Sequence, residues 1–105
     1  MPTVSRGFVH QDELKEEIAQ VVRTLDSNEV REVHFRLGTD AGGEPAIFFG
    51  IVLSANASRD ERIGAVTGKI SETLFDELQP YNRWGLLPYF DYTSDRAFYT
   101  GADWT

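Results

Sequence analysis

The chain has 105 residues, enough for one domain with its own core, and 41% of them are apolar. It carries 17 acidic against 10 basic residues, a formal net charge of −7, and no cysteine. This composition excludes disulfides and thiolate metal sites and favours a cytoplasmic protein. It also disfavours nucleic-acid binding, because that function needs a basic stripe and the basic residues here are scattered.

No apolar run approaches the roughly 20 residues of a membrane-spanning helix, so we expect no contact with a membrane. We expect a single α+β domain over residues 1–105. Within it, residues 1–10 are predicted to form an N-terminal arm and residues 94–105 an aromatic C-terminal tail.

The first predicted element is a surface helix in the stretch HQDELKEEIAQVVRTLDSNE. Its apolar residues recur at helical spacing and predict one buried stripe. They are Leu14, Ile18, Val21, Val22 and Leu25. Asp12 is the predicted N-cap, since a short acidic side chain there accepts hydrogen bonds from the first turn.

Two strands follow as a predicted hairpin around the turn sequence TDAGGEP. The first, VREVHFRLG, alternates, with Val33, Phe35 and Leu37 on one side. That pattern predicts a strand buried on one face only. The second, AIFFGIVLS, has apolar residues at both its odd and its even positions, so we expect it to be covered on both faces.

A second amphipathic helix is predicted to begin at a capping box, Ser58 to Glu61, and to end at Pro80. Gly64 and Gly68 on this helix predict the close approach of another backbone. A third strand is expected over residues 83–93. Pro88 places this strand at a sheet edge, because proline cannot donate to a strand ladder.

The resulting order is helix, strand, strand, helix, strand. We expect a two-layer α+β sandwich, a variant of the ferredoxin-like plan. Its mostly antiparallel sheet should have the strand order 2-1-3, with both helices on one face.

This order, with VREVHFRL before a hairpin, resembles the cytoplasmic C-terminal domain of cation diffusion facilitators at the level of pattern, over residues 14–92. That family's domain binds metal through histidines and acids, and only His34 corresponds here. The order is also similar to the ribosome-binding factor A family. The RNA surface of that family is basic, whereas this chain is acidic.

A sheet with both helices on one side leaves its other face bare, and we call this the open face. The residues predicted to lie there are Glu32, His34, Arg36, Phe48, Val52, Leu87, Tyr89 and Asp91. An exposed face of this kind marks an interaction site. The chain's own ends, a second copy, or a ligand or other protein are the alternatives for what covers it.

The end of the chain is rich in aromatic residues, with eight of the 13 lying between Tyr81 and Thr105. Part of this group is predicted to be strand and core. The remaining aromatic residues of the C-terminal tail, together with apolar residues of the open face, form the predicted interaction surface. It comprises Phe48, Val52, Leu87, Phe98, Tyr99 and Trp104.

Motifs for catalysis are not found, since the chain has no P-loop, no GxGxxG and no G-x-S-x-G. His10 and His34 are isolated in the sequence, so we expect no metal and no cofactor. The first hypothesis is therefore a non-catalytic acidic protein that acts by protein contact, as an adaptor, accessory subunit or immunity-type inhibitor, and that self-associates through its open face as a homodimer.

The alternative is a small-ligand-binding or enzymatic domain with its site on the same face. The predicted site residues are His34, Arg36, Tyr89 and Asp91. In this hypothesis Arg36 holds a small anion through two hydrogen bonds and His34 transfers protons.

Overall fold

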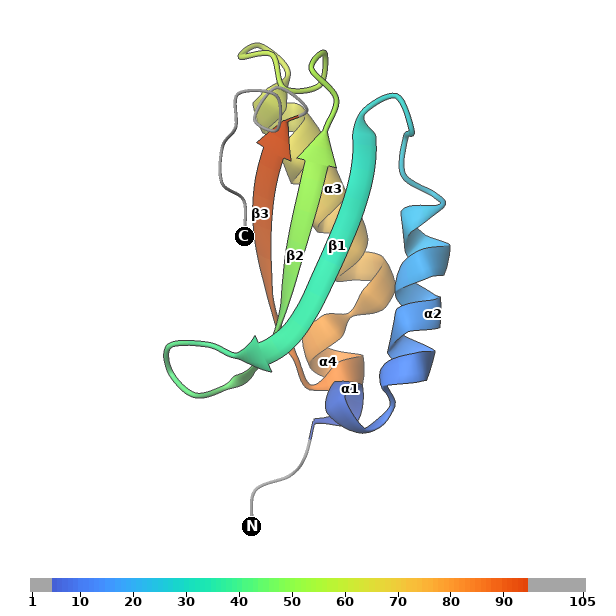
Figure 1. Ribbon diagram of the computed structural model, residues 1–105, viewed down its shortest axis with the longest axis vertical. Coiled ribbons are helices and arrows are strands. Elements are labelled where there is room, and N and C mark those ends of the chain that lie inside the picture. Colours follow the sequence, from blue (N-terminus) through green and yellow to red (C-terminus); the bar gives the residue numbers. More distant parts are fainter. Residues whose placement is uncertain (1–4, 95–105) are drawn as a thin grey trace.

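A three-stranded mixed β-sheet with helices behind it forms the frame of the chain (Figure 1). The structure is a computed structural model, and it describes residues 5–94. The α+β class agrees with the prediction. The elements in chain order are α1 (Arg6–Val9), α2 (Gln11–Val22), β1 (Val30–Thr39), β2 (Pro45–Leu53), α3 (Ile63–Leu78), α4 (Pro80–Trp84) and β3 (Leu87–Ser94).

The strand order is β1-β2-β3, so the predicted order 2-1-3 is wrong. β1 pairs with β2 antiparallel, and β3 pairs with β2 in parallel, which makes the sheet mixed rather than mostly antiparallel. The physical reason lies in β2, which is apolar on both faces and is buried best with a neighbour on each side. The crossover through α3 therefore returns β3 beside β2, and β1 stays at an edge.

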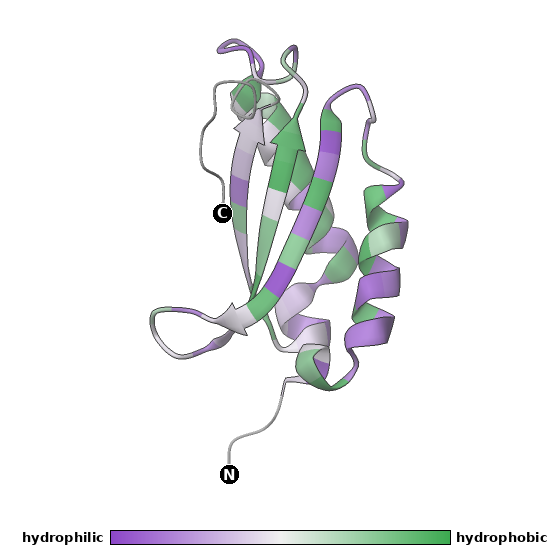
Figure 2. Ribbon diagram, viewed as in Figure 1, coloured by the Kyte–Doolittle hydropathy of each residue, from purple (hydrophilic) through white to green (hydrophobic). Residues whose placement is uncertain are grey.

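The burial of β2 follows from this central position. Ile47, Phe49 and Ile51 point toward the helices and are almost fully buried. Figure 2 shows the difference between the strands: β2 is hydrophobic along most of its length, whereas β1 alternates between hydrophobic and hydrophilic residues. The side chains of Val33 and Phe35 on β1 are only partly buried, because β1 has a strand on one side only.

α2 and α3 lie on the same side of the sheet (Figure 1), and their apolar stripes meet its inner face. The helical residues of this core are Leu14, Ile18, Val21, Val66, Ile70, Leu74 and Leu78. Phe90 of β3 stacks on Phe49 with ring centroids 5.4 Å apart. The helical periodicity in the sequence thus identified most of both buried stripes. The exception is Ile63, the first residue of the stripe predicted for the second helix, which is 38% exposed.

The start of α3 differs from the prediction. The helix begins at Ile63, and the capping box from Ser58 to Glu61 does not form. Instead, the Ser58 hydroxyl donates to the carbonyl of Ser54 at 2.8 Å within a run of turns. A serine four residues from a carbonyl forms such a local bond as readily as a cap, and the turns after β2 favour it.

A buried carboxylate ties the start of α3 to the sheet. Glu29, which precedes β1, is 6% exposed. Its two oxygens lie 2.9 Å from the Arg62 guanidinium and 2.7 Å from the Lys69 ammonium. Because Arg62 directly precedes α3 and Lys69 lies in its second turn, the ion pairs fix this end of the helix against the beginning of β1.

Gly64 and Gly68 do not allow the close approach that was predicted. A Cβ atom added at either residue meets nothing within 4 Å. Both glycines lie on the outer side of α3, away from its buried stripe. They therefore leave space on the surface of the helix and make no packing contact there.

The third strand begins later than predicted, at Leu87, because residues 80–84 form the short helix α4. Pro80 stands at the first position of α4, where its missing N–H costs nothing. Gln79 before it and Gly85 after it adopt left-handed backbone conformations, with φ of 46° and 65°. These two residues bend the chain sharply enough for α4 to fit between α3 and β3.

The stretch predicted as an N-terminal arm contains helix α1, which packs against α4. The Ser5 hydroxyl donates to the carbonyl of Trp84 at 2.6 Å, and the Arg6 guanidinium lies 4.4 Å from the centre of the Trp84 ring. Gly7 makes this packing possible, since a Cβ atom there would lie 2.5 Å from a methyl carbon of Leu86. The first helix of the described chain is thus held against α4 and the segment that leads into β3.

Candidate functional site

The open face is the side of the sheet turned away from α2 and α3, which faces the viewer in Figure 1. Strand register arranges its side chains in rows that run across all three strands, because paired residues point to the same side. The rows are Gly38–Ala46–Leu87, Arg36–Phe48–Tyr89, His34–Gly50–Asp91 and Glu32–Val52–Thr93. All four residues predicted for a ligand site fall in the two middle rows.

The row of Arg36, Phe48 and Tyr89 is a continuous stack. The Arg36 guanidinium lies 4.2 Å from the centre of the Phe48 ring, as in a cation–π contact. On the other side of Phe48, the Tyr89 ring is nearly parallel, with centroids 5.3 Å apart and an interplanar angle of 16°. Tyr89 is 43% exposed, so the stack presents aromatic surface to solvent at the β3 end.

The hairpin loop between β1 and β2 closes one end of this stack. The Tyr89 hydroxyl donates to Oδ2 of Asp40 at 2.7 Å, and Oδ1 of Asp40 accepts from the amides of Gly42 and Glu44, each at 2.9 Å. The bond from Tyr89, helped by these amides, lowers the pKa of the Asp40 carboxyl. The same bond raises the pKa of the Tyr89 hydroxyl.

Asp40 is the site residue that sequence reasoning missed. It lies 49 positions from Tyr89, and nothing in the sequence links the two. A partial signal was present, because an aspartate followed two residues later by glycine favours a turn held by its own side chain. That pattern predicts the loop bonds of Asp40 but not the bond to Tyr89.

The next row places His34 and Asp91 on either side of Gly50, which contributes no side chain between them. Their backbones are two strand spacings apart, about 10 Å. Nε2 of His34 lies 3.8 Å from Oε2 of Glu32 on the same strand. The geometry thus brings His34 to Glu32, whereas His34 and Asp91 face each other across the strand that separates them.

The residues predicted for an interaction surface differ in how far their side chains are exposed. Phe48 and Leu87 are partly exposed, but Val52 is only 1% exposed although it points to the open face. The remaining predicted residues lie outside the described part of the chain. They are Phe98, Tyr99 and Trp104.

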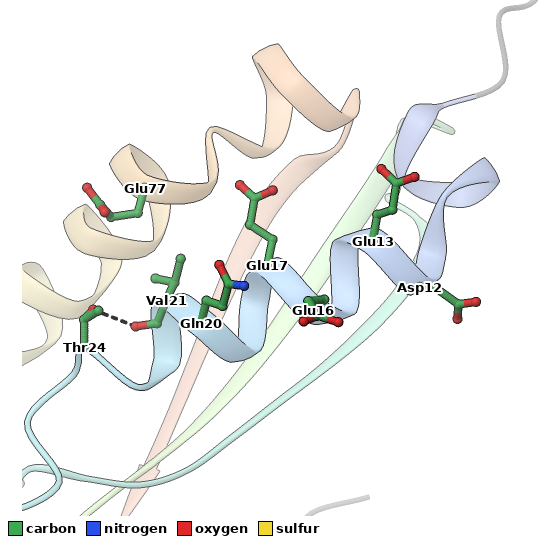
Figure 3. Close-up of a pocket in the computed structure, with 8 residues that line it drawn as sticks. All are labelled: Asp12, Glu13, Glu16, Glu17, Gln20, Val21, Thr24 and Glu77. Carbon is green, nitrogen blue, oxygen red and sulfur yellow. Dashed lines mark hydrogen bonds between the residues drawn. The ribbon is translucent and has the colours of Figure 1, made fainter.

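Figure 3 shows a second feature, an open groove between α2 and α3. The residues that line it are Asp12, Glu13, Glu16, Glu17, Gln20, Val21, Thr24 and Glu77. Two of its carboxylates are already paired: Glu17 with Arg83, and Glu13 with Arg6 at 3.4 Å. We therefore regard the groove as a solvated acidic surface that raises the negative charge of the helical side.

Two further aromatic side chains are exposed where α3 turns into α4. Phe75 is 51% exposed and Tyr81 is 61% exposed. Both line a shallow depression at this turn. Phe75 belongs to α3, on the other side of the sheet from the Arg36–Phe48–Tyr89 stack, so the two aromatic surfaces are separate.

Among residues 5–94, no group of three or more histidine or acidic side chains is arranged to hold a metal ion. The helices of this part of the chain include none that is long and apolar enough to cross a membrane. Comparison of the chain with protein-family models, with curated proteins and with solved structures finds no match.

Proposed function

We propose that this chain is a non-catalytic protein that acts by protein–protein contact through its open sheet face. The role is that of an adaptor, an accessory subunit or an immunity-type inhibitor. The same face is the surface through which we expect any self-association. The observation that carries this proposal is the stack of Arg36, Phe48 and Tyr89 on a face that no helix of residues 5–94 covers (Figure 1).

The residue types in the stack favour a contact surface. Arginine and tyrosine are enriched among the residues that dominate the binding energy of interfaces, because they combine large contact area with few rotatable bonds per hydrogen bond formed. The stack is also held in place before binding, since Tyr89 is bonded to Asp40 and Arg36 rests on Phe48. Little side-chain entropy is then lost when a partner docks.

The size of the face limits how it is used. Three strands about 4.8 Å apart, each rising about 3.3 Å per residue over eight residues, cover a flat area of about 380 Å². One side of a standard interface buries about 800 Å². A tight partner must therefore also contact neighbouring surface, and the hairpin loop beside Tyr89 is the part of the chain best placed for that.

The proposal is tested by affinity capture from the native host at low salt. Wild type, Arg36→Ala, Tyr89→Ala and the control Tyr81→Ala are compared, the control removing an equally large exposed aromatic ring from another surface. We expect one stoichiometric partner with wild type and with Tyr81→Ala, reduced at least about tenfold by the other two variants. A partner captured equally by all four, or no stoichiometric partner, contradicts the proposal.

The second candidate is a small-ligand site on the same face. The observation that favours it is the placing of His34, Arg36, Tyr89 and Asp91 in two adjoining rows. We expect His34→Ala combined with Arg36→Ala to abolish binding of a small anion while circular dichroism and the unfolding midpoint stay unchanged. Calorimetric titration with inorganic phosphate and with acetate measures this, and identical heats for wild type and the double variant exclude the site.

A further inference from the structure

One edge of the sheet is formed by β1, which pairs with β2 alone among the strands of residues 5–94. The amide of Asp40 donates to the carbonyl of Glu44 at 2.9 Å, which marks a hydrogen-bonded pair at the hairpin end of the ladder. Bonded and non-bonded pairs alternate along an antiparallel ladder, and the register runs without a shift from there to Glu32. Every second residue of β1 therefore directs its backbone N–H and C=O groups away from β2, to the outer edge. In the middle of the strand these residues are Val33, Phe35 and Leu37.

This edge lacks the features that usually keep an exposed strand from pairing. Proteins protect such edges with proline, lysine or a β-bulge, or keep the strand short. Residues 32–39 include neither proline nor lysine, and the irregularity in the β1–β2 pairing lies before them, between Val30 and Glu32. The other edge strand, β3, contains Pro88, which cannot donate to a ladder. The β1 edge is therefore the better of the two for accepting a further strand.

The core beneath the β1 edge is incompletely closed. Val33, Phe35 and Leu37 face the helices but are only partly buried, and so is Val22 of α2. In Figure 1 the helical layer extends past this edge, because α2 lies beyond β1. An added strand would thus lie over α2, and apolar side chains at its alternate positions would pack there. A whole second copy is a poorer fit, since its own α2 would have to share the layer that α2 already fills.

The side chains of β1 on the open face define the charges of a matching strand. Glu32 and Arg36 lie four positions apart on this face, and both are exposed. The Arg36 guanidinium is held over Phe48 and forms no ion pair with a carboxylate of residues 5–94. Opposite charges that face each other across two strands are favourable. A strand that matches this edge therefore has a basic residue opposite Glu32 and an acidic residue opposite Arg36.

We propose that the β1 edge binds an extended segment of the partner protein and adds it to the sheet as an antiparallel fourth strand. Antiparallel pairing is the more stable direction per residue. The segment has the pattern acidic, apolar, any residue, apolar, basic, with its acidic residue opposite Arg36. This inference rests on the proposed function and deepens it by naming the kind of partner. A segment bound beside Arg36 brings the rest of the partner to the adjoining stack with Phe48 and Tyr89.

The experiment uses the full chain, which has no cysteine of its own, and synthetic peptides. The matched peptide is Thr-Asp-Val-Cys-Val-Lys-Thr, and its cysteine lies opposite His34 in the proposed register. This is a non-hydrogen-bonded pair with Cα atoms about 4.5 Å apart, so a disulfide can form with the variant His34→Cys. The control variant is Asp91→Cys, which places an exposed cysteine in the same row on the other edge strand.

Two further peptides test the pairing itself. One carries methyl groups on the backbone nitrogens of both valines, which lie opposite Val33 and Phe35 and donate to β1. The other exchanges the aspartate and the lysine. In a glutathione buffer we expect the matched peptide to form the disulfide with His34→Cys at least about tenfold more than with Asp91→Cys, measured by mass spectrometry. Methylation should reduce the yield at least about tenfold, and the charge exchange at least about threefold.

Equal yields with His34→Cys and Asp91→Cys overturn the inference, because labelling is then not specific to the β1 edge. An undiminished yield with the methylated peptide overturns it as well, since backbone pairing is then not what holds the peptide. An undiminished yield after the charge exchange overturns the stated pattern of the segment. A disulfide-linked dimer that His34→Cys forms in preference to the peptide adduct identifies a second copy as the occupant and overturns the choice of a partner segment.

The same peptides separate this inference from the proposed function. If the matched peptide adds to β1 while Tyr89→Ala leaves capture of the partner unchanged, strand addition stands and the stack is not the contact. If the peptide does not add while Tyr89→Ala reduces capture, the proposed function stands and strand addition fails. When both hold, an excess of the matched peptide with serine in place of cysteine competes with the partner and reduces its capture by wild type.

Discussion

The hydroxyl of Tyr89 donates a hydrogen bond to Oδ2 of Asp40, and this bond joins the edge strand β3 to the hairpin loop across the width of the sheet. It stabilises the deprotonated form of Asp40 and the protonated form of Tyr89, which is why the pKa of Asp40 is lowered and that of Tyr89 is raised. The loop is thereby held against the exposed ring of Tyr89 on the open face.

A pH dependence of stability follows from these two shifts. A lowered pKa means that the stabilisation from Asp40 is present above its ordinary value of 3.8 and is lost as the pH falls through the lowered pKa. For Tyr89 the stabilisation is present below 10.0 and is lost as the pH rises through the raised pKa. We expect Tyr89→Phe to lower the urea midpoint at pH 7, and this difference from wild type to shrink toward pH 2.

The control for this prediction is Tyr81→Phe, which removes a hydroxyl from an exposed ring on α4. Its midpoint should follow that of wild type at every pH. A difference between Tyr89→Phe and wild type that stays constant from neutral to acid pH contradicts the coupling to Asp40.

The ion pairs of Glu29 predict a second measurable effect. Glu29→Gln keeps the shape of the side chain but leaves the Arg62 and Lys69 cations without a carboxylate. Because both cations are partly exposed and can be hydrated, we expect a loss of about 1–3 kcal/mol in the free energy of unfolding. The matched control is Glu61→Gln, which breaks an exposed pair with Arg59 and should cost less than about 1 kcal/mol. Equal losses in urea titrations would mean that burial of Glu29 adds nothing.

The open space around Gly64 and Gly68 predicts stabilisation by alanine. Each substitution adds a Cβ atom that meets nothing within 4 Å and removes the conformational freedom of glycine, so we expect a gain of about 0.5–1 kcal/mol at each site. Gly85→Ala is the opposite case, because Gly85 has φ of +65° and an added Cβ atom lies 3.4 Å from the Ser5 hydroxyl. Thermal unfolding of the three variants tests the contrast, and a gain at Gly85 would refute it.

The bond from Ser5 to the carbonyl of Trp84 predicts a cost at the beginning of the chain. Ser5 is buried, and its hydroxyl also accepts from the amide of Gly7 at 3.2 Å. Ser5→Ala leaves both groups without this partner, so we expect a loss of about 1–3 kcal/mol in the free energy of unfolding. Ser27→Ala on the exposed turn before β1 serves as control and should be nearly neutral.

Local patterns in the sequence predicted much of this fold. The apolar spacing of the two long helices and the alternation of β1 identified the residues that face the core, and they also placed His34 and Arg36 on the open face. These predictions succeeded because side-chain direction repeats with a fixed period along a helix or a strand. The residues of that element alone are enough to reveal the period.

The errors share a different cause. The errors concern the strand order, the start of α3 and the helix α4. In each case the local sequence is compatible with several arrangements, and the tertiary packing selects one of them. The sequence of β2 did indicate the strand order. Its residues are apolar on both faces, and such a strand belongs at the centre of a sheet. The bond between Asp40 and Tyr89 had no such signal, because it depends on a loop conformation and a register that are both set by tertiary packing.

The contact between α1 and α4 also bears on the order in which the chain folds. The bond from Ser5 to Trp84 spans 79 positions, whereas the β1–β2 hairpin joins residues that are close in sequence. Long-range contacts close large loops and form late, so we expect the hairpin in the folding transition state and the α1–α4 contact only after it. Stopped-flow measurements should then show that Ser5→Ala accelerates unfolding and leaves the refolding rate unchanged. The first residues of the described chain would then reach their native contacts after the hairpin has formed.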